Sequence, residues 1–445
     1  MIVQKIKNII KKRFSRLYAI RQEFLKVNPI FDTRYLDKKI GDHALSIVRR
    51  PRTVGSINNH NIALLASELY DMGGHTELLK NFVQALPKEY NCKIFLTRKT
   101  QSEQNLVYKI AEIIQYTEIG GVDFYWKNEK KLLNNVFKQI MAFAPQKLIT
   151  FIHMDDAFAV ALLALIKKYT QTAIVFCNIG SHHASLGMSF AHLIGEGMPS
   201  TAFVTQKFRG FKNTKVLGLC HLTKAQLPVF KAQEVSKTRR ELGIPDHSFC
   251  TMTGCSSYKL FENGLSPYFE MIKNLLDKNQ DIYHILVTQL NSEQKHIVDT
   301  LQIPDRLIVT DFKPNFKLFF KCADVFIDSY PVSSALTIVD LMSLNIPFVS
   351  CRNKDNLTYT FFEYLPKNYD YLYDNIFDMQ AGIEKLLSNK EERERIENAN
   401  YAYYLENFEG SIAVRRILEA DTFDPEIDEA EYKDFKEIKL MPWGK

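Results

Sequence analysis

A repeated alternation of short apolar runs with helical stretches is the feature that most constrains the fold of this chain. It begins near residue 53 and restarts near residue 249. This order is typical of βα units, which build a parallel sheet with helices on its faces. The sequence therefore predicts an α/β protein. The runs expected as strands are His60–Ser67, Cys92–Thr97, Lys147–Ile152, Thr172–Asn178, Thr201–Thr205, Lys215–Cys220, Phe249–Gly254, Ile282–Thr288, Leu307–Val309, Val325–Asp328 and Ile346–Ser350.

A polar, highly charged stretch over residues 222–246 separates the two series of runs, and we interpret it as an interdomain linker. The 445 residues suffice for two or three domains at roughly 100–200 residues each. Helices are expected near 74–86, 127–144, 155–169, 264–277, 291–301, 316–322 and 334–344. The predicted organisation is a basic N-terminal extension (1–52), two Rossmann-like domains (53–221 and 247–410) and a C-terminal tail (411–445).

The positive charge is concentrated at the N-terminus. The chain carries +6 overall, yet residues 1–52 hold fourteen Lys and Arg against four Asp and Glu. Their apolar residues recur at helical spacing, so residues 1–26 could form a basic helix on an anionic membrane surface. The alternative is a helix whose apolar side packs on the protein body. Nucleic-acid binding is not expected, because the apolar residues there are mostly Ile and Leu rather than aromatics interleaved with the charge.

Cysteine usage and hydropathy indicate a cytoplasmic protein, peripheral at the inner membrane face if the basic helix binds lipid. The seven cysteines form no CxxC pair, and the charged start of the chain lacks the features of a signal peptide. The longest apolar run, Ala157–Ile166, is half of the about 20 residues that a transmembrane helix needs.

The segment 328–350 predicts a phosphate-binding loop. An expected strand leads into small hydroxylated residues, so Ser333, Ser334 and Thr337 gather near the N-terminus of a helix, where backbone N–H groups favour a phosphate. Asp340 lies one helical turn after Thr337, where a carboxylate can accept both hydroxyls of a nucleotide ribose. The alternative is an ordinary serine-rich helix cap followed by a solvated aspartate.

Three segments resemble known glycosyltransferases. The segment 328–350, which ends in Leu-Asn-Ile-Pro-Phe-Val-Ser, resembles the nucleotide-sugar motif of GT-B enzymes. Gly-Cys-Ser-Ser-Tyr-Lys259-Leu is similar to the segment of O-GlcNAc transferases and cytoplasmic bacterial N-glycosyltransferases whose lysine binds the donor diphosphate. The stretch 178–187 resembles the "NHADH…LG" segment of those bacterial enzymes: the Asn, second His, Leu and Gly are kept, and the intervening His-Ala-Asp is replaced.

The resemblance implies a GT-B fold, with two Rossmann-like domains whose parallel sheets face an interdomain cleft. It implies a nucleotide sugar, UDP-linked, as substrate and no separate cofactor, with a glycan or a protein as acceptor and Lys259 neutralising the UDP leaving group. Gly73 and Gly74 resemble the glycine turn that lines the donor-facing side of the cleft, the alternative being a tight structural turn. Their spacing is not GxGxxG, which argues against hydride transfer.

Histidines are the candidates for the base that glycosyl transfer to a hydroxyl requires near neutral pH. We rank His182 first because of the family spacing, then His153, then His75, while each alone could be a structural histidine. Asp155 and Asp156 are adjacent but do not form a DxD pair, so no metal site is expected.

Two further expectations concern the reaction. Many retaining GT-B enzymes carry two glutamates eight positions apart, whereas this chain has Val332 and Asp340 in those places, which favours inversion. The main alternative is a non-catalytic GT-B subunit that binds acceptor protein and supports a partner enzyme. The presence of Lys259, Thr337 and Asp340 together argues against it, and nucleotide-sugar epimerisation is the other enzymatic alternative.

Overall fold

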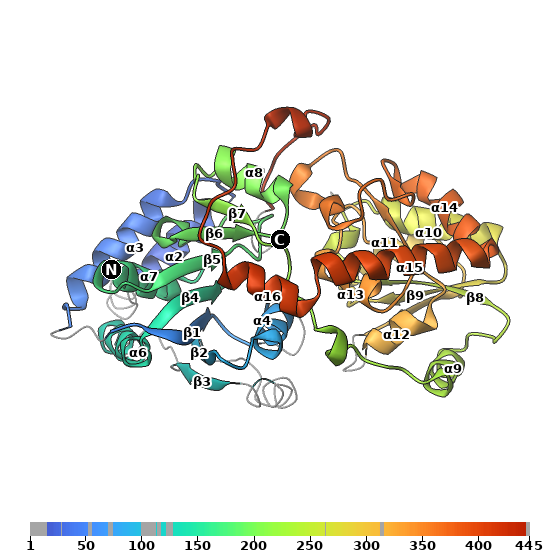
Figure 1. Ribbon diagram of the computed structural model, residues 1–445. Coiled ribbons are helices and arrows are strands. Elements are labelled where there is room, and N and C mark those ends of the chain that lie inside the picture. The colour runs from blue at the N-terminus through green and yellow to red at the C-terminus, as the bar shows by residue number, and fades with distance from the viewer. Residues whose placement is uncertain are drawn as a thin grey trace. The chain divides into compact units, whose positions relative to one another are not determined.

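The computed structural model describes residues 16–27, 29–51, 56–69, 74–98, 113, 117–121, 128–262, 264–311 and 316–441. The chain forms two compact units, and each is described here by itself (Figure 1). Unit 1 comprises the chain up to Leu222 with Gly410–Ala430 and the segment from Lys439, and unit 2 comprises Thr223–Glu409 with Glu431–Ile438.

Unit 1 contains a seven-stranded parallel sheet in the order β3-β2-β1-β4-β5-β6-β7. The first six strands follow the doubly wound order 3-2-1-4-5-6, in which ligands bind outside the carboxyl ends where the order reverses, here between β1 and β4. The strands are β1 (Asn58–Ala66), β2 (Asn91–Leu96), β3 (Glu118–Gly121), β4 (Pro145–Phe151), β5 (Ala173–Cys177), β6 (Leu193–Glu196) and β7 (Thr214–Val216).

A buried helix, α7, explains the longest apolar run of the sequence. Its residues from Ala157 to Ile166 are all buried, because α2, α3 and α6 pack against it. A helix that is apolar on all sides belongs in the interior of a protein. The described helices of unit 1 include α2 (Arg16–Val27), α3 (Arg34–Ile47), α4 (Gly74–Ala85), α6 (Glu129–Phe143), α7 (Ala157–Tyr169), α8 (Pro199–Lys207) and α16 (Gly410–Leu418).

The described part of the basic N-terminal region is integral to unit 1. Leu17, Ile20 and Phe24 of α2 are buried in the same hydrophobic core as α3 and α7. Residues 16–47 are therefore not a separate extension, and the packed-helix alternative holds for α2. Residues 1–15 lie outside the described residues. Among the described helices, none has the length and apolar character needed to cross a membrane.

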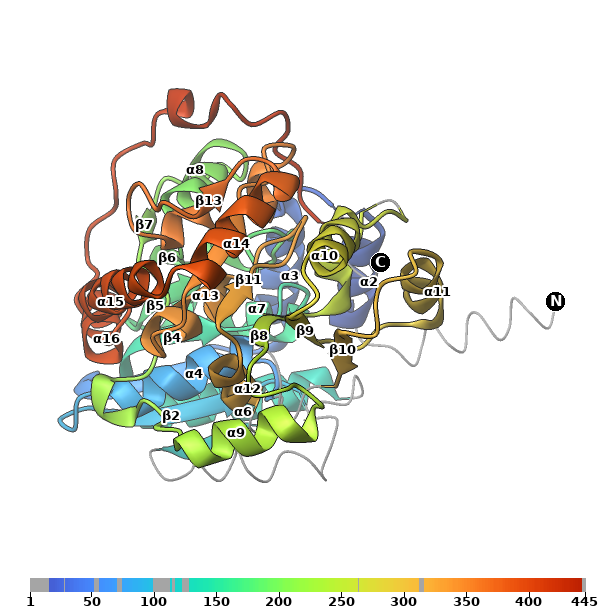
Figure 2. The same ribbon diagram turned by 90° about the vertical axis from the view of Figure 1, so that its right-hand side faces the viewer.

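Unit 2 contains a six-stranded parallel sheet in the order β10-β9-β8-β11-β12-β13, so its order reverses between β8 and β11 (Figure 2). Its strands are β8 (Phe249–Gly254), β9 (Ile282–Val287), β10 (Leu307–Thr310), β11 (Val325–Ile327), β12 (Phe348–Cys351) and β13 (Leu372–Tyr373). Its described helices include α9 (Ala232–Glu241), α10 (Pro267–Lys278), α11 (Ser292–Thr300), α12 (Phe316–Cys322), α13 (Ala335–Ser343), α14 (Met379–Ser388) and α15 (Lys390–Asn407).

The expected linker and tail differ from the structure. The stretch 222–246 includes helix α9 and joins unit 2 from Thr223 onward, where Arg239 donates to the carbonyls of Cys322 at 2.9 Å and Ser248 at 2.5 Å. The tail 411–445 is divided between the two units. In unit 1, Asp424 accepts a hydrogen bond from the backbone of Val216 at 2.6 Å. These bounds follow from long-range contacts that hydrophobic periodicity does not report.

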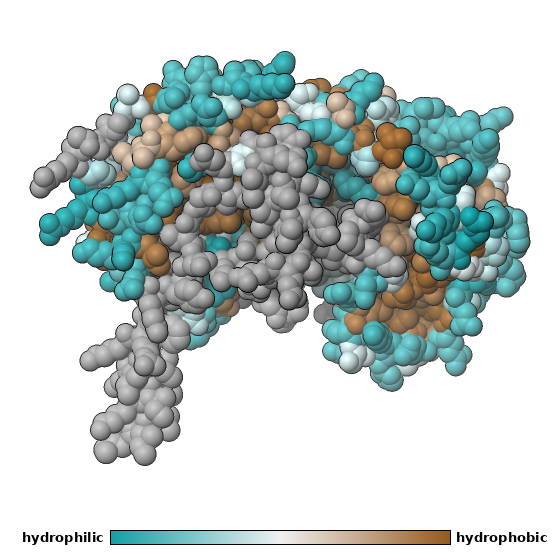
Figure 3. All heavy atoms as spheres, turned by 90° about the horizontal axis from the view of Figure 1, so that it is seen from below, coloured by the Kyte–Doolittle hydropathy of each residue, from teal (hydrophilic) through white to brown (hydrophobic). Residues whose placement is uncertain are grey.

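The surface is largely polar where it is described. Viewed from below, hydrophilic residues dominate and apolar side chains gather in limited areas (Figure 3). Val229 and Leu265 are among the exposed large apolar residues, at 91% and 64% of their full exposure. Isolated apolar residues of this kind are ordinary on protein surfaces.

Candidate active site

Lys259 lies at the carboxyl edge of the unit 2 sheet, where the strand order reverses. It follows β8 in a short 3-10 helix, Ser257–Leu260, and its Nζ donates to the Ser333 carbonyl, which follows β11, at 2.9 Å. Burial lowers the pKa of Lys259, while Cys255 and Asp328 oppose the shift. The structure thus brings Lys259 together with the loop that was predicted to bind phosphate.

A buried carboxylate, Asp328, organises this loop. It accepts hydrogen bonds from the hydroxyls of Ser333 at 2.6 Å and Ser350 at 2.7 Å and from the amide of Ser334 at 3.0 Å. The Ser334 hydroxyl lies 2.8 Å from that of Ser329. Both predicted serine hydroxyls therefore shape the loop itself. The first-turn amides of α13, which have no acceptor within the helix, remain as donors suited to an anion.

Asp340 is buried on α13, so it is not the solvated aspartate of the alternative. Its Oδ1 lies 2.7 Å from Nζ of Lys317 on α12, and both side chains are largely shielded from solvent. Thr337, one turn earlier, is half-buried. The structure thus places Asp340 within a charge pair, a feature that the motif did not reveal.

The predicted histidines gather at the carboxyl edge of the unit 1 sheet. His75 lies in the first turn of α4 after β1, His153 follows β4, and His182 follows β5 beside His183. The ring centroids of His75 and His153 are 4.8 Å apart, and those of His182 and His183 are 4.3 Å apart. Burial, with the nearby His153 and His183, lowers the pKa of His75 to about 3, so its ring is neutral.

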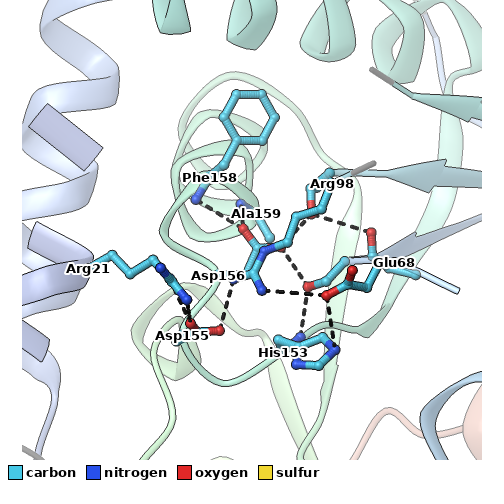
Figure 4. Close-up of polar contacts among 11 residues, drawn as sticks. Arg21, Glu68, Arg98, His153, Asp155, Asp156, Phe158 and Ala159 are labelled. Carbon is cyan, nitrogen blue, oxygen red and sulfur yellow. Dashed lines mark hydrogen bonds and ion pairs between the residues drawn. The ribbon is translucent and has the colours of Figure 1, made fainter. Parts of the chain in front are cut away.

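A charged cluster lies beside His153 (Figure 4). The Nε2 atom of His153 is 3.8 Å from Oε1 of Glu68, and the backbone amide of His153 donates to the Ser67 hydroxyl at 2.8 Å. Arg98, which follows β2, lies 3.8 Å from the same Glu68 oxygen. Burial and Arg98 lower the pKa of His153, which outweighs the opposing acidic groups. The ring is therefore held in its neutral form.

Asp155 and Asp156 serve ion pairing and helix capping. Asp155 accepts from Arg98 at 2.8 Å and from Nε of Arg21 at 2.6 Å (Figure 4). Burial raises the pKa of Asp155, but the two arginines more than offset this and hold it below its ordinary value. Asp156 caps α7 by accepting from the amides of Phe158 and Ala159 at 3.1 and 3.0 Å. Within the described residues, no group of three or more His, Cys, Asp and Glu is arranged to hold a metal ion.

The remaining predicted residues belong to unit 1. Gly74 is the first residue of α4, while Gly73 lies outside the described residues. Sequence reasoning missed Arg209, which donates to the carbonyls on either side of His182, and Met441, which donates to the carbonyl of His182 itself. No sequence motif indicates either residue, because both contact the loop from positions far away in the sequence.

The two parallel sheets, each in doubly wound order with its candidate residues at the carboxyl edge, give this chain the GT-B fold. No protein-family model and no curated protein matches the sequence. Solved structures match in fold. The chain is similar to a glycosyltransferase from Rickettsia africae ESF-5, with a TM-score of 0.62 and 12% identity over 82% of this chain and 100% of the other.

Two further structures have the same fold. Anabaena Alr3699/HepE, in complex with UDP-glucose, has a TM-score of 0.62 and 14% identity over 81% of this chain and 98% of its own. A Thermobaculum terrenum O-GlcNAc transferase variant has a TM-score of 0.54 and 12% identity over 92% of this chain and 75% of its own. These similarities confirm the predicted GT-B fold.

Proposed function

We propose that this protein is a glycosyltransferase that moves a sugar from a UDP-linked donor to a glycan or protein acceptor. The observation that carries the proposal is the Lys259–Ser333 contact at 2.9 Å, which sets a partly buried cation beside the N-terminus of α13. Proteins with this fold include one solved with UDP-glucose, which supports a UDP-sugar as the donor.

Lys259 and the α13 loop are proposed to bind the diphosphate. In the structure, the partly buried ammonium of Lys259 donates to a neutral carbonyl. A diphosphate would give it a negatively charged acceptor, which makes a stronger hydrogen bond. The backbone amides after Ser334 and the Thr337 hydroxyl would add hydrogen bonds, with the Ser333 and Ser334 hydroxyls holding the loop in shape. Donors placed where charge develops on the leaving group stabilise the transition state.

Asp340 is proposed to accept the ribose hydroxyls and to exchange part of its pairing with Lys317 for them. Gly73 and Gly74 are proposed to line the donor-facing side of unit 1. With an ammonium and helix amides to stabilise the leaving diphosphate, the reaction needs no metal ion and no further cofactor.

His182 is proposed as the base, with His153 and His75 next in rank. A neutral imidazole can take the acceptor proton as the new bond forms, and His75 and His153 show that this edge keeps histidines neutral. A single base with direct displacement corresponds to inversion.

The proposed location is cytoplasmic, and any lipid contact would be made by residues before Arg16, because the apolar side of α2 is in the core.

The proposal is tested by mass spectrometry of the protein with a panel of nucleotide sugars and candidate acceptors. We expect release of UDP and a mass increase of one sugar on the acceptor, with no loss of activity in a metal chelator. A non-catalytic subunit would bind acceptor protein and release no UDP. An epimerase would return an isomer of the donor without transfer. Either result would replace the proposal.

A further inference from the structure

One buried guanidinium holds the main chain around His182. Arg209, which follows α8, is only 1% exposed. Its Nη2 donates to the carbonyls of Ser181 at 2.6 Å and His183 at 3.0 Å, the residues on either side of His182. A fully buried arginine is rare unless it is paired, so this contact requires an explanation.

The guanidinium lies near the buried carboxyl group of Glu196, which is hydrogen-bonded to the start of the same loop. Burial lowers the pKa of Arg209 to about 10, and the charge of Glu196 opposes the shift. Glu196, the last residue of β6, accepts from Asn178 at 2.8 Å and from Thr205 at 2.5 Å. Asn178 directly follows β5, where the loop to His182 begins. Arg209 and Glu196 thus act on both ends of the segment 178–183, which we call the histidine loop.

This arrangement is a poor way to stabilise a fold. Among the described residues, Nε and Nη1 of Arg209 have no hydrogen-bond partner, and neither does Oε2 of Glu196. Buried polar groups without partners each cost about 1–3 kcal/mol. Replacing both members of a buried charge pair by well-packed apolar side chains is often neutral or stabilising. The geometry therefore favours a role in placing the loop.

The segment around Met441 also holds the histidine loop. The amide of Met441 donates to the His182 carbonyl at 2.7 Å, and the Met441 carbonyl lies 2.8 Å from Nδ1 of His183. Leu440, next to it, is buried in the hydrophobic core of unit 1 and anchors the contact. A carbonyl can only accept, so Nδ1 of His183 carries the proton.

We propose that Arg209 and Met441 are positioning residues that fix the histidine loop so that His182 is presented for proton transfer. The consequence for catalysis rests on the proposed function, whereas the effect on the loop does not. Residues 181, 182 and 183 each have their carbonyl held by one of these two partners. The main chain of the loop is therefore held by these two residues, and Met441 also holds the His183 ring through Nδ1.

The test compares Arg209→Met with Arg209→Lys and with the control Lys207→Met. Lys207 is a half-exposed cation on α8 that pairs with Glu429. We expect Arg209→Met to lower kcat by ~10–100-fold, as loss of an orienting partner does, with UDP affinity unchanged. Arg209→Lys should recover part of the activity, because it keeps the charge and one donor. Lys207→Met should behave as the wild-type protein.

Histidine titration by NMR separates this proposal from the proposed function. His183 faces Arg209, His75, His182 and the Met441 carbonyl. Burial lowers the pKa of His183, and Arg209 lowers it further. The His183 pKa should therefore rise in Arg209→Met and stay unchanged in Lys207→Met. If the wild-type protein transfers no sugar, the proposed function fails, and the titration still shows whether Arg209 acts on the histidine loop.

A second variant keeps the test decisive should Arg209→Met fail to fold. Met441→Pro removes the amide that bonds to His182 and leaves the chain at full length. It should lower kcat without changing UDP affinity, and it should alter the His183 titration. Unchanged His183 titration with wild-type kcat, in whichever of the two variants folds, would overturn the proposal.

Discussion

At the scale of single residues, burial determines the charge state of the candidate groups. Lys259 and His75 are both shifted toward their neutral forms by burial, whereas Asp155 is kept charged by Arg98 and Arg21. A group that is neutral in the folded protein and titrates freely when unfolded links stability to pH.

His75 gives a pH dependence of known sign. Its pKa is lowered to about 3 in the folded state, below the ordinary value of 6.5, so the unfolded chain binds more protons as the pH falls below 6.5. The stability contributed by neutral His75 is present above pH 6.5 and declines between that value and pH 3. Urea unfolding at pH 7 and pH 5 should show a smaller loss for His75→Phe than for the wild type. An equal loss in both proteins would contradict the shift, and His296→Gln, an exposed position, is the control.

The proposed base predicts a change in turnover alone. His182→Ala should lower kcat by ~10²–10⁴-fold, because general-base catalysis contributes that much in the transition state. UDP affinity, measured by calorimetry, should be unchanged. A near wild-type rate for His182→Ala, with turnover abolished in His153→Ala or His75→Ala, would move the role to one of those residues.

The proposed role of Asp340 predicts that the protein discriminates between ribose and 2′-deoxyribose donors. Asp340→Asn keeps the shape of the side chain but loses the charge that would bind the hydroxyls, so the donor KM should rise while kcat changes little. The variant also disrupts the pair with Lys317, so a 2′-deoxy donor provides the second measurement. The wild-type protein should use the deoxy donor poorly. Equal use of both donors would remove Asp340 from the ribose site.

At the scale of elements, periodicity located most strands and helices and failed where burial removes the pattern. The run Thr201–Thr205, expected as a strand, lies in helix α8, where all seven residues from Ser200 to Gln206 are buried. A fully buried helix and a buried strand share the same continuous apolar run. Strand β6, of only four residues, was missed because Glu196 interrupts the apolar signal.

The packing of α2 predicts a stability effect. Phe24 is fully buried in the core of unit 1, so Phe24→Ala should lower the free energy of unfolding by about 3–5 kcal/mol. Urea denaturation measures this directly. Exposed Tyr35 on α3, at 44% exposure, offers the control Tyr35→Ala, which should change stability little. A neutral effect of Phe24→Ala would show that α2 is not part of the core.

At the scale of the whole molecule, short motifs predicted a set of candidate donor residues, and long-range contacts determine features that the motifs do not show. The sequence indicated Lys259 and the serine loop because each lies within a few residues of a strand end. It could not indicate Arg209 and Met441, because their partners are distant in sequence. Asp328 is only five residues from Ser333, but the sequence does not show that its carboxylate accepts hydrogen bonds from that loop. Domain bounds failed for the same reason, since the chain returns to unit 1 after Glu409.

The central claim is that unit 2 binds a UDP-linked donor through Lys259, and calorimetry of UDP binding tests it most directly. Lys259→Ala should weaken UDP binding by ~10–100-fold, because a charge-assisted contact to phosphate contributes about 1.5–3 kcal/mol. Lys237→Ala, at an exposed lysine of the same unit, should leave the affinity unchanged. Equal UDP affinity in wild type and Lys259→Ala, or no UDP binding by the wild-type protein, would contradict the account.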